Sequence, residues 1–170
     1  METWDAIRSR RDVREYADVP LRPDELDQVL EAGRRSPSSR NWQPWDFVVV
    51  TERASLKKLT GVWMGAGHAA NAAAAIVLVG PTQTEERKRQ LLEYDLGQAT
   101  MNMMIAATDL GLGTCHSRVD DQDLARELLG IPQDHFAAYF FSLGHPANGP
   151  LKPVTLKRRP FDEVVHRGRW

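Results

Sequence analysis

The sequence contains a single cysteine, Cys115, which excludes a disulfide bond within the chain and fits a reducing compartment. No apolar run approaches the roughly 20 residues that a transmembrane helix requires. The N-terminal residues carry charges where a signal peptide would need an apolar stretch. The net charge of -1 gives no general attraction to nucleic acid or to an anionic membrane. We therefore expect a cytoplasmic protein that has neither nucleic acid nor a membrane as partner.

Metal sites and two common catalytic arrangements are also missing. The five histidines show no metal-ligand spacing, and most of them are predicted to be surface or capping groups. Ser38 and Ser39 lack the Gly-x-Ser-x-Gly turn of hydrolases. Cys115 and His116 are neighbours on a predicted strand, so their side chains point to opposite faces and the cysteine has no adjacent base. We expect no metal and no catalytic side chain of these kinds.

A glycine-rich stretch at 65–70, Gly-Ala-Gly-His-Ala-Ala, nearly matches the dinucleotide-binding pattern Gly-x-Gly-x-x-Gly/Ala. That motif requires a strand before the glycines and a helix after them. Here a helical pattern precedes the glycines, so we reject a Rossmann site. We predict instead that 61–70 is a flexible crossing into the next strand.

The overall amino-acid composition is typical of a globular protein, because 42% of the 170 residues are hydrophobic and 26% are charged. This length predicts one domain that spans residues 1–170. The first predicted helix is expected to turn Trp4 and Ile7 inward. Apolar periodicity predicts helices over 3–9, 23–35, 53–59, 85–110 and 121–129, and strands over 47–50, 75–79, 114–117 and 137–143.

The longest periodic segment, 85–110, is apolar nearly all round from Leu96 onward, which predicts a helix buried on several sides. The sheet of one small domain covers only one of those sides. The remaining apolar patch would be too large for a stable monomer, so we predict that a second copy packs against it. The patch is expected to include some of Met101, Met103, Met104 and Ile105.

Residues 36–45, Ser-Pro-Ser-Ser-Arg-Asn-Trp-Gln-Pro-Trp, lie between a predicted helix and a predicted strand. Their hydroxyls and amides offer short donors and acceptors, the prolines fix the backbone, and the indoles add flat surfaces. A turn-rich connector is the ordinary alternative for such a loop. The density of polar groups beside flat rings favours the wall of a pocket for a planar ligand rich in heteroatoms.

Basic residues are concentrated at the two ends of the chain, with Arg10, Arg11 and Arg14 near the start and Lys157 and Arg159 near the end. Guanidinium groups suit phosphate oxygens because they donate in a rigid fork. Terminal basic clusters are more often solvated tails than sites. If the two ends meet in the fold, however, they form an anion site large enough for a phosphate.

Several separated segments together resemble the FMN-dependent nitroreductase family. The loop at 36–45 is similar to the family signature Ser-Pro-Ser-Ser-x-Asn-x-Gln-Pro-Trp, and 10–14 is similar to its Arg-Arg-Ser-x-Arg start. Residues 111–115 resemble its Gly-Leu-Gly-Ser/Thr-Cys stretch, and 157–166 resemble its C-terminal Lys-x-Arg-Lys/Arg-Pro-Leu-x-Glu-Val-Val-His. The motifs agree in order and approximate spacing, and with the predicted elements they cover most of the chain.

The resemblance implies an α+β fold with a mostly antiparallel central sheet flanked by helices. It implies a homodimer with the long helix at the interface and the C-terminal extension over the partner subunit. Each non-covalent FMN would take the N-terminal arginines from one chain and the loop at 36–45 from the other. The implied cofactor-binding residues are Arg10, Arg11, Asp12, Arg14, Pro37, Ser38, Ser39, Asn41, Ser117, Arg118, Lys157 and Arg159.

The chain departs from the family pattern in three ways. Asp12 stands where the family has a serine that contacts the phosphate, so we expect Asp12 to act through its backbone or to pair with an arginine. Val119 replaces a glycine that many members have beside the flavin ring. Residues 61–75 and 79–86 leave little room for the helices that often cover the flavin.

The resemblance implies an oxidoreductase that passes hydride or electrons from NAD(P)H to a nitroaromatic or quinone-like acceptor by a ping-pong mechanism. No catalytic side chain is required, because the flavin supplies the chemistry. Two alternatives remain open at this point. One is a different reaction on the same scaffold, such as reductive dehalogenation or flavin fragmentation, and the other is a flavin-binding protein without turnover.

Overall fold

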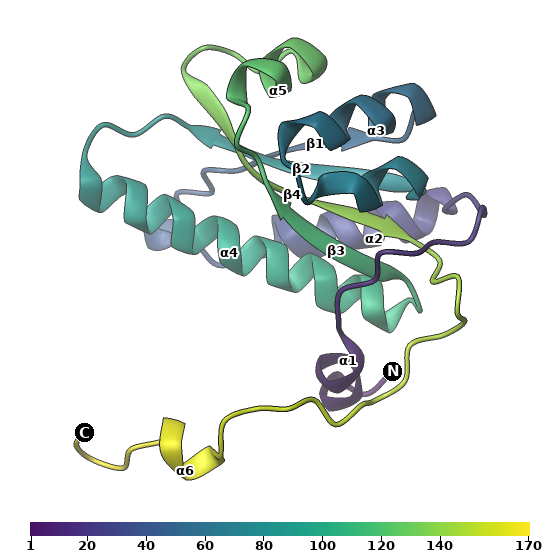
Figure 1. Ribbon diagram of the computed structural model, residues 1–170. Helices are drawn as coiled ribbons and strands as arrows, with labels where there is room; N and C mark the ends of the chain where they lie inside the picture. The colour runs from purple at the N-terminus through teal and green to yellow at the C-terminus, as the bar shows by residue number, and fades with distance from the viewer.

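The computed structural model describes residues 1–170, which are built around a four-stranded sheet (Figure 1). The strands are β1 (Asp46–Val50), β2 (Ala74–Pro81), β3 (Gly113–Arg118) and β4 (His135–Gly144). They lie in the order β1-β2-β4-β3, and every neighbouring pair is antiparallel. The predicted α+β architecture with an antiparallel sheet is confirmed.

Strand burial follows position in the sheet. Every residue of β2 from Ala74 to Gly80 is buried, as expected for a central strand that is covered on both faces. The apolar run at 47–50 in β1 is a sequence pattern that predicts a buried strand as well. Because β1 is an edge strand, its residues 47–49 are only half-buried, and Val50 alone is fully enclosed.

Helices cover both faces of the sheet. α2 (Pro23–Arg34) and α4 (Glu86–Asp109) lie on one face, and α3 (Arg53–Leu59) and α5 (Gln122–Leu129) lie on the other (Figure 1). These four helices lie within two residues of their predicted bounds. Two separate cores result, because Ile76 packs toward α2 and α4 whereas its neighbour Val77 packs toward α3 and α5.

The prediction of a flexible crossing over 61–70 is wrong. The chain there forms two short 3₁₀ helices, η2 (Thr60–Val62) and η3 (Ala66–Asn71). Ala66 and Ala69 are completely buried in the core beneath α3. The small side chains of these alanines pack the segment against the core, so its glycines do not make it a flexible linker. Rejection of the Rossmann site is confirmed, since α3 precedes the glycines and the sheet is antiparallel.

The long helix α4 packs its methionines differently from the prediction. Met103 and Met104 are 0% and 2% exposed and belong to the core between α4, α2 and the sheet, so neither is available to a second subunit. Met103 fits closely against α2, because a Cβ on Gly33 would lie 2.7 Å from its Sδ. Met103 and Met104 are therefore removed from the expected interface.

A different set of side chains on α4 faces away from the core. Leu91, Tyr94 and Met101 are 38%, 67% and 44% exposed, and Ile105 is half-buried. These four residues, which we call the α4 stripe, recur at helical spacing along one line of the helix. Gly97 lies between Tyr94 and Met101, and a Cβ built there would meet nothing within 4 Å.

The C-terminal tail passes α1 and then continues away from it and from the sheet, so that the two termini lie far apart (Figure 1). In α1 (Thr3–Ser9), Trp4 and Ile7 are 66% and 45% exposed, so the prediction that they turn inward is wrong. The C-terminal tail passes α1, where the Val154 amide donates to the Arg8 carbonyl at 3.3 Å. Every residue after Val154, including α6 (Phe161–Val164), is exposed. None of the helices has the length and apolarity needed to cross a bilayer.

Candidate functional site

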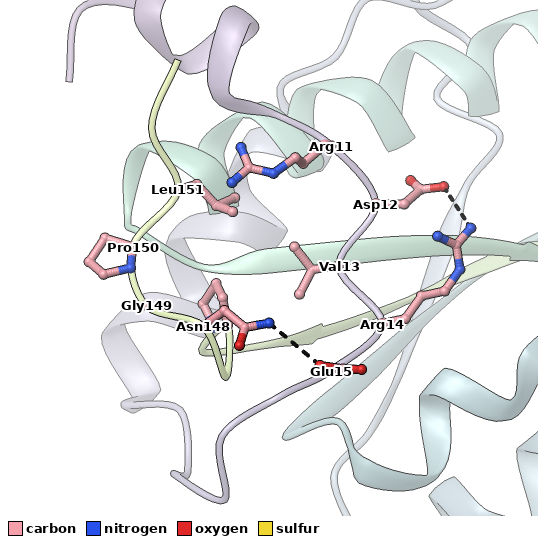
Figure 2. Close-up of a pocket in the computed structure, with 10 residues that line it drawn as sticks. Arg11, Asp12, Val13, Arg14, Glu15, Asn148, Gly149, Pro150 and Leu151 are labelled. Carbon is pink, nitrogen blue, oxygen red and sulfur yellow. Dashed lines mark hydrogen bonds and ion pairs between the residues drawn. The ribbon is translucent and has the colours of Figure 1, made fainter. Parts of the chain in front are cut away.

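The N-terminal arginine segment is extended and lies along the free edge of β3. Asp12 forms a parallel bridge with Thr114, and the Val13 amide donates to the Thr114 carbonyl at 2.8 Å. The approach is close enough to require a glycine, since a Cβ on Gly113 would lie 2.7 Å from the Val13 Cβ. Alternate side chains therefore point to opposite sides, and Figure 2 shows Asp12 and Arg14 directed away from Arg11.

Asp12 joins the neighbouring cations into one group. Its carboxylate accepts from Arg10 Nη1 at 3.2 Å and from Arg14 Nη2 at 3.3 Å, and His116 Nδ1 lies 3.5 Å from Oδ1. The expectation that Asp12 pairs with an arginine is confirmed. We call Arg10, Asp12, Arg14 and His116 the Asp12 cluster. The Arg14 side chain is 65% exposed, so the cluster still presents a guanidinium to the outside.

Arg11 has a structural role on the other side of the segment. Its Nη1 donates to the Ser9 carbonyl at 3.0 Å and to the Lys152 carbonyl at 3.1 Å, and it thereby attaches the tail to the N-terminal segment. The pocket that Arg11 lines with Leu151 and Asn148 has a volume of about 280 Å³ (Figure 2). That volume lies below the ~300–1,000 Å³ typical of small-molecule sites.

The two basic ends of the chain meet only in part. The tail contacts the N-terminal segment through Arg8 and Arg11, but Arg159 turns to its own neighbour and donates from Nη2 to the Glu163 carbonyl at 3.0 Å. No hydrogen bond or ion pair within the chain joins Lys157 or Arg159 to the Asp12 cluster. Their convergence with Arg10 on one phosphate stays a prediction.

The loop at 36–45 holds an unusual backbone. Arg40, Asn41 and Gln43 have φ values of 55°, 59° and 52°, and non-glycine residues seldom adopt such left-handed conformations. The loop is held in place because the Ser38 Oγ accepts from the Gln43 amide at 2.8 Å and the Ser39 amide donates to Asp95 of α4 at 3.0 Å. Backbone strain of this kind concentrates at functional sites.

These restraints leave specific groups of the loop free. The Ser39 hydroxyl and the Asn41 carboxamide form no hydrogen bond within the chain, whereas the Ser38 hydroxyl is used by the loop itself. Pro37 is exposed beside them, and Trp42 is 41% exposed while Trp45 is buried in the core. The loop therefore presents one hydroxyl, one amide and one indole outward.

At the end of β3, only some of the predicted contacts point outward. Arg118 is exposed and its Nε donates to Asp120 at 2.6 Å. The Ser117 hydroxyl is buried and faces inward, so the backbone is the part of this residue that can meet a ligand. Val119 also points inward and joins the core beneath α5.

A buried polar network supports β3 from below, and the sequence did not indicate it. The His68 ring lies between two hydroxyls, with Nδ1 2.6 Å from Ser142 Oγ and Nε2 2.9 Å from Ser117 Oγ. Tyr16 Oη lies 2.6 Å from the same Ser142 Oγ. His68 is 8% exposed and is therefore an exception to the prediction that most of the histidines are surface or capping groups. Its alanine-rich surroundings carried no motif that could have revealed the network.

Burial lowers the pKa of His68 to about 4, and the nearby Arg14 guanidinium acts in the same direction. The unfolded chain therefore takes up a proton near pH 6.5 that the folded chain refuses until about pH 4. The free energy of unfolding should fall as pH drops through this window. His68 alone should account for a fall of roughly 2 kcal/mol between pH 7 and pH 5. Denaturant titrations at the two pH values measure the loss.

The matched variants for this pH test are His68→Gln and His166→Gln. His166 is exposed on the tail, so its variant should retain the full pH dependence of the parent protein. In His68→Gln, the loss of unfolding free energy between pH 7 and pH 5 should be about 2 kcal/mol smaller than in the parent protein. An identical pH dependence in all three proteins would show that His68 is not held neutral by the fold.

In one chain the loop lies against the N-terminal half of α4, whereas the Asp12 cluster lies near the C-terminal end of this helix. Ser39 is attached to Asp95, whereas the Asp12 cluster adjoins Thr114, just beyond the helix end at Asp109. The fourteen positions from Asp95 to Asp109 span about 21 Å along a helix axis. No hydrogen bond or ion pair joins the two sets, so one chain presents two separate groups of predicted cofactor ligands. Of the α4 stripe, Met101 and Ile105 lie between Asp95 and Asp109, and Leu91 and Tyr94 precede Asp95.

Comparison with known proteins identifies the family. The Nitroreductase family profile matches residues 7–81 and 62–145. The chain is 33% identical over 168 residues to a putative NADH dehydrogenase/NAD(P)H nitroreductase of Archaeoglobus fulgidus, covering 96% of each. This chain belongs to the nitroreductase family. It is also 26% identical to an FMN reductase [NAD(P)H] of Bacillus subtilis, over 98% of this chain and 73% of that protein.

Solved structures of other nitroreductases share the fold. A putative NADH dehydrogenase/NAD(P)H nitroreductase from Parabacteroides distasonis superposes with a TM-score of 0.86 at 26% identity, covering 100% of this chain and 99% of the other. An FMN-dependent nitroreductase from Clostridium difficile superposes with a TM-score of 0.85 at 24% identity, covering 97% and 98%. The family resemblance drawn from the four motifs is therefore confirmed along nearly the whole chain.

Proposed function

We propose that this protein is an NAD(P)H-dependent flavin oxidoreductase that binds FMN non-covalently between two copies of the chain. Electrons would pass from NAD(P)H to a nitroaromatic or quinone-like acceptor in a ping-pong cycle. The observation that carries the proposal is the presence of two complementary groups of ligands, a cationic cluster and a polar loop, on a chain of the nitroreductase family.

The residues of the Asp12 cluster and of the loop fit FMN. Arg10 and Arg14 present two guanidinium groups against the single carboxylate of Asp12, which leaves a net positive charge for a phosphate. The free hydroxyl of Ser39 and the free carboxamide of Asn41 suit the heteroatoms of a flavin ring or its ribityl chain. Arg118 and the β3 backbone lie on the same side as His116 and Asp12 and would flank the ring.

A composite site follows from the separation of these groups. Because no hydrogen bond or ion pair joins the loop to the Asp12 cluster within one chain, one flavin would draw its phosphate ligands and its β3 contacts from one chain and its contacts with the loop at 36–45 from the partner. The exposed tail after Val154, with apolar Leu156, Phe161 and Trp170, forms no hydrogen bond or ion pair with the preceding part of its own chain and would lie over the partner. The FMN-binding unit would then be one domain, residues 1–170, repeated twice.

The side chains have binding and positioning roles in this scheme. FMN, when bound, supplies both the hydride-accepting and the electron-donating chemistry. Arg10, Lys157 and Arg159 would hold the phosphate, Arg14 would contact the ring or the ribityl chain, and the strained loop would hold Ser39 and Asn41 against the ring. The His68 network would keep β3 rigid behind the ring, since Ser117 is bonded to it. No residue here needs to donate or accept a proton for hydride transfer.

A flavin-binding protein without turnover is the second candidate, because Asp12 and Val119 depart from the family pattern and the segments at 61–75 and 79–86 leave little cover for a flavin. Initial-rate kinetics separate the two. A ping-pong oxidoreductase gives parallel double-reciprocal lines when NAD(P)H is varied at several fixed concentrations of menadione or a nitroaromatic. Absence of NAD(P)H oxidation by flavin-loaded protein would support the binding protein, and intersecting lines would contradict the ping-pong cycle.

A further inference from the structure

A second concave site adjoins the signature loop. It has a volume of about 600 Å³ and lies between the loop and the first turns of α4. This is within the range of ~300–1,000 Å³ that small-molecule sites occupy. Its lining residues are Ser39, Arg40, Trp42, Glu85, Arg87, Lys88 and Leu91.

Two features of the loop position the walls of this pocket. Arg40 is held in a left-handed conformation with φ 55°, between Ser39, which is bonded to Asp95, and Asn41, which is also left-handed. Neighbouring hydrogen bonds hold this strained backbone in place, and they thereby fix the positions from which its side chains extend. Trp42 follows and exposes 41% of its surface, so an indole face is available at the pocket.

The charges around the pocket are unbalanced. Three cations face one carboxylate, which gives the lining a net charge of +2, in a chain whose net charge is -1. Lys88 binds that carboxylate, Glu85, at 3.0 Å. Arg40 and Arg87 form no ion pair within the chain, although the adjacent Arg89 is bound by Glu86 and Glu93. Two guanidinium groups are thus left without an anion.

We infer that this pocket binds the anionic, planar part of a substrate, with the ring against Trp42 and the negative group against Arg40 and Arg87. An indole stacks on a flat ring, and guanidinium groups donate to phosphate or carboxylate oxygens in forked pairs. Leu91 adds apolar contact at the rim. Neutral planar compounds would lose the charged contact and bind more weakly.

This inference rests on the proposed function, because Ser39 lines the pocket and is also an expected flavin contact. A ligand in the pocket would therefore lie next to the flavin ring. Two substrates of a flavin oxidoreductase have the required chemistry. One is the adenosine 2′-phosphate end of NADPH, and the other is an aromatic electron acceptor that carries a carboxylate.

Arg87→Gln tests the inference with matched pairs of substrates. The first pair is NADPH and NADH, and the second is 4-nitrobenzoate and neutral 4-nitrobenzyl alcohol. We expect the kcat/KM ratio of the anionic to the neutral member to fall about tenfold in one pair, because a charge-assisted hydrogen bond is lost. The pair whose ratio falls identifies the source of the anion.

Arg89→Gln is the control, since Arg89 is on the same helix but does not line the pocket. Its ratios should equal those of the parent protein. Calorimetric titration with adenosine 2′,5′-bisphosphate and with 4-nitrobenzoate gives a second readout that requires no turnover. Binding of one probe, weakened about tenfold by Arg87→Gln and unchanged by Arg89→Gln, supports the site even if the protein does not oxidise NAD(P)H.

The inference is overturned if neither ratio falls more in Arg87→Gln than in Arg89→Gln. It is equally overturned if neither probe binds, or if both variants bind the probes as tightly as the parent protein. An active enzyme with unchanged ratios would contradict this pocket alone. An inactive protein with weakened probe binding would contradict only the proposed oxidoreductase function.

Discussion

Replacing Tyr94 and Met101 together with glutamate is expected to yield a folded monomer that has lost its FMN. Both side chains are exposed on the α4 stripe, at 67% and 44%, so the core of the single chain should tolerate the change. In a two-fold interface each carboxylate would be buried near its symmetry mate, at a cost of several kcal/mol. Dimer affinity should fall by about 100-fold or more. Light scattering and flavin content, measured on one sample, give the result.

The control for this experiment adds the same charge elsewhere. Ala54→Glu combined with Gln133→Glu introduces two carboxylates at exposed positions outside α4, and it should leave both mass and flavin content unchanged. A Tyr94→Glu/Met101→Glu protein that is monomeric and retains full FMN occupancy would refute the composite site. A variant that stays dimeric would show that the α4 stripe is not the interface.

Arg159→Ala is expected to weaken FMN binding by about one to two decades, since a charge-assisted phosphate contact is worth about 1.5–3 kcal/mol. Riboflavin has no phosphate and should bind the variant and the parent protein alike. In the free chain Arg159 lies beside Glu163, with Nε 3.6 Å from Oε2, so it must exchange this exposed partner for the phosphate. Fluorescence quenching of the two flavins measures both affinities.

Two further variants make this test specific. Arg169→Ala removes a charge from the same exposed tail outside the family motif, and it should leave both flavins unaffected. Asp12→Asn removes the carboxylate that pairs with Arg10 and Arg14, so it should tighten FMN binding and leave riboflavin unchanged. Equal losses of FMN and riboflavin in Arg159→Ala would show that Arg159 acts through folding and not through the phosphate.

Local sequence patterns were sufficient to place the four strands and the helices α1 to α5, but not η2, η3 or α6. α4 begins and ends within one residue of its predicted bounds, because its apolar period is sustained and Gly111, with φ 80°, follows its end. The bounds of α5 were equally predictable. In the structure the Asp121 side chain accepts a hydrogen bond from the Leu124 amide at the start of α5, and Gly130 ends the helix in a left-handed conformation. Such signals depend only on residues that are close in sequence, so they can be recognised without knowledge of the tertiary fold.

Tertiary contacts decided what the patterns could not. Met101 and Met103 are two positions apart on one helix, and only the packing of α2 against α4 determines that Met103 is in the core and Met101 outside it. Ser117 fell in the right segment, but the orientation of its hydroxyl depends on His68, 49 positions earlier in the chain. The pairing of Asp12 was predictable because both of its arginines are two positions away.

The central claim is that this chain forms a flavin enzyme, and anaerobic mixing of the purified protein with NADPH and with NADH tests it most directly. The protein should carry the visible absorption bands of oxidised FMN, either as purified or after FMN is added and excess removed. At least one of the two nucleotides should bleach those bands in a single turnover, and addition of a quinone should restore them. A colourless protein that also fails to quench the fluorescence of added FMN would contradict the account.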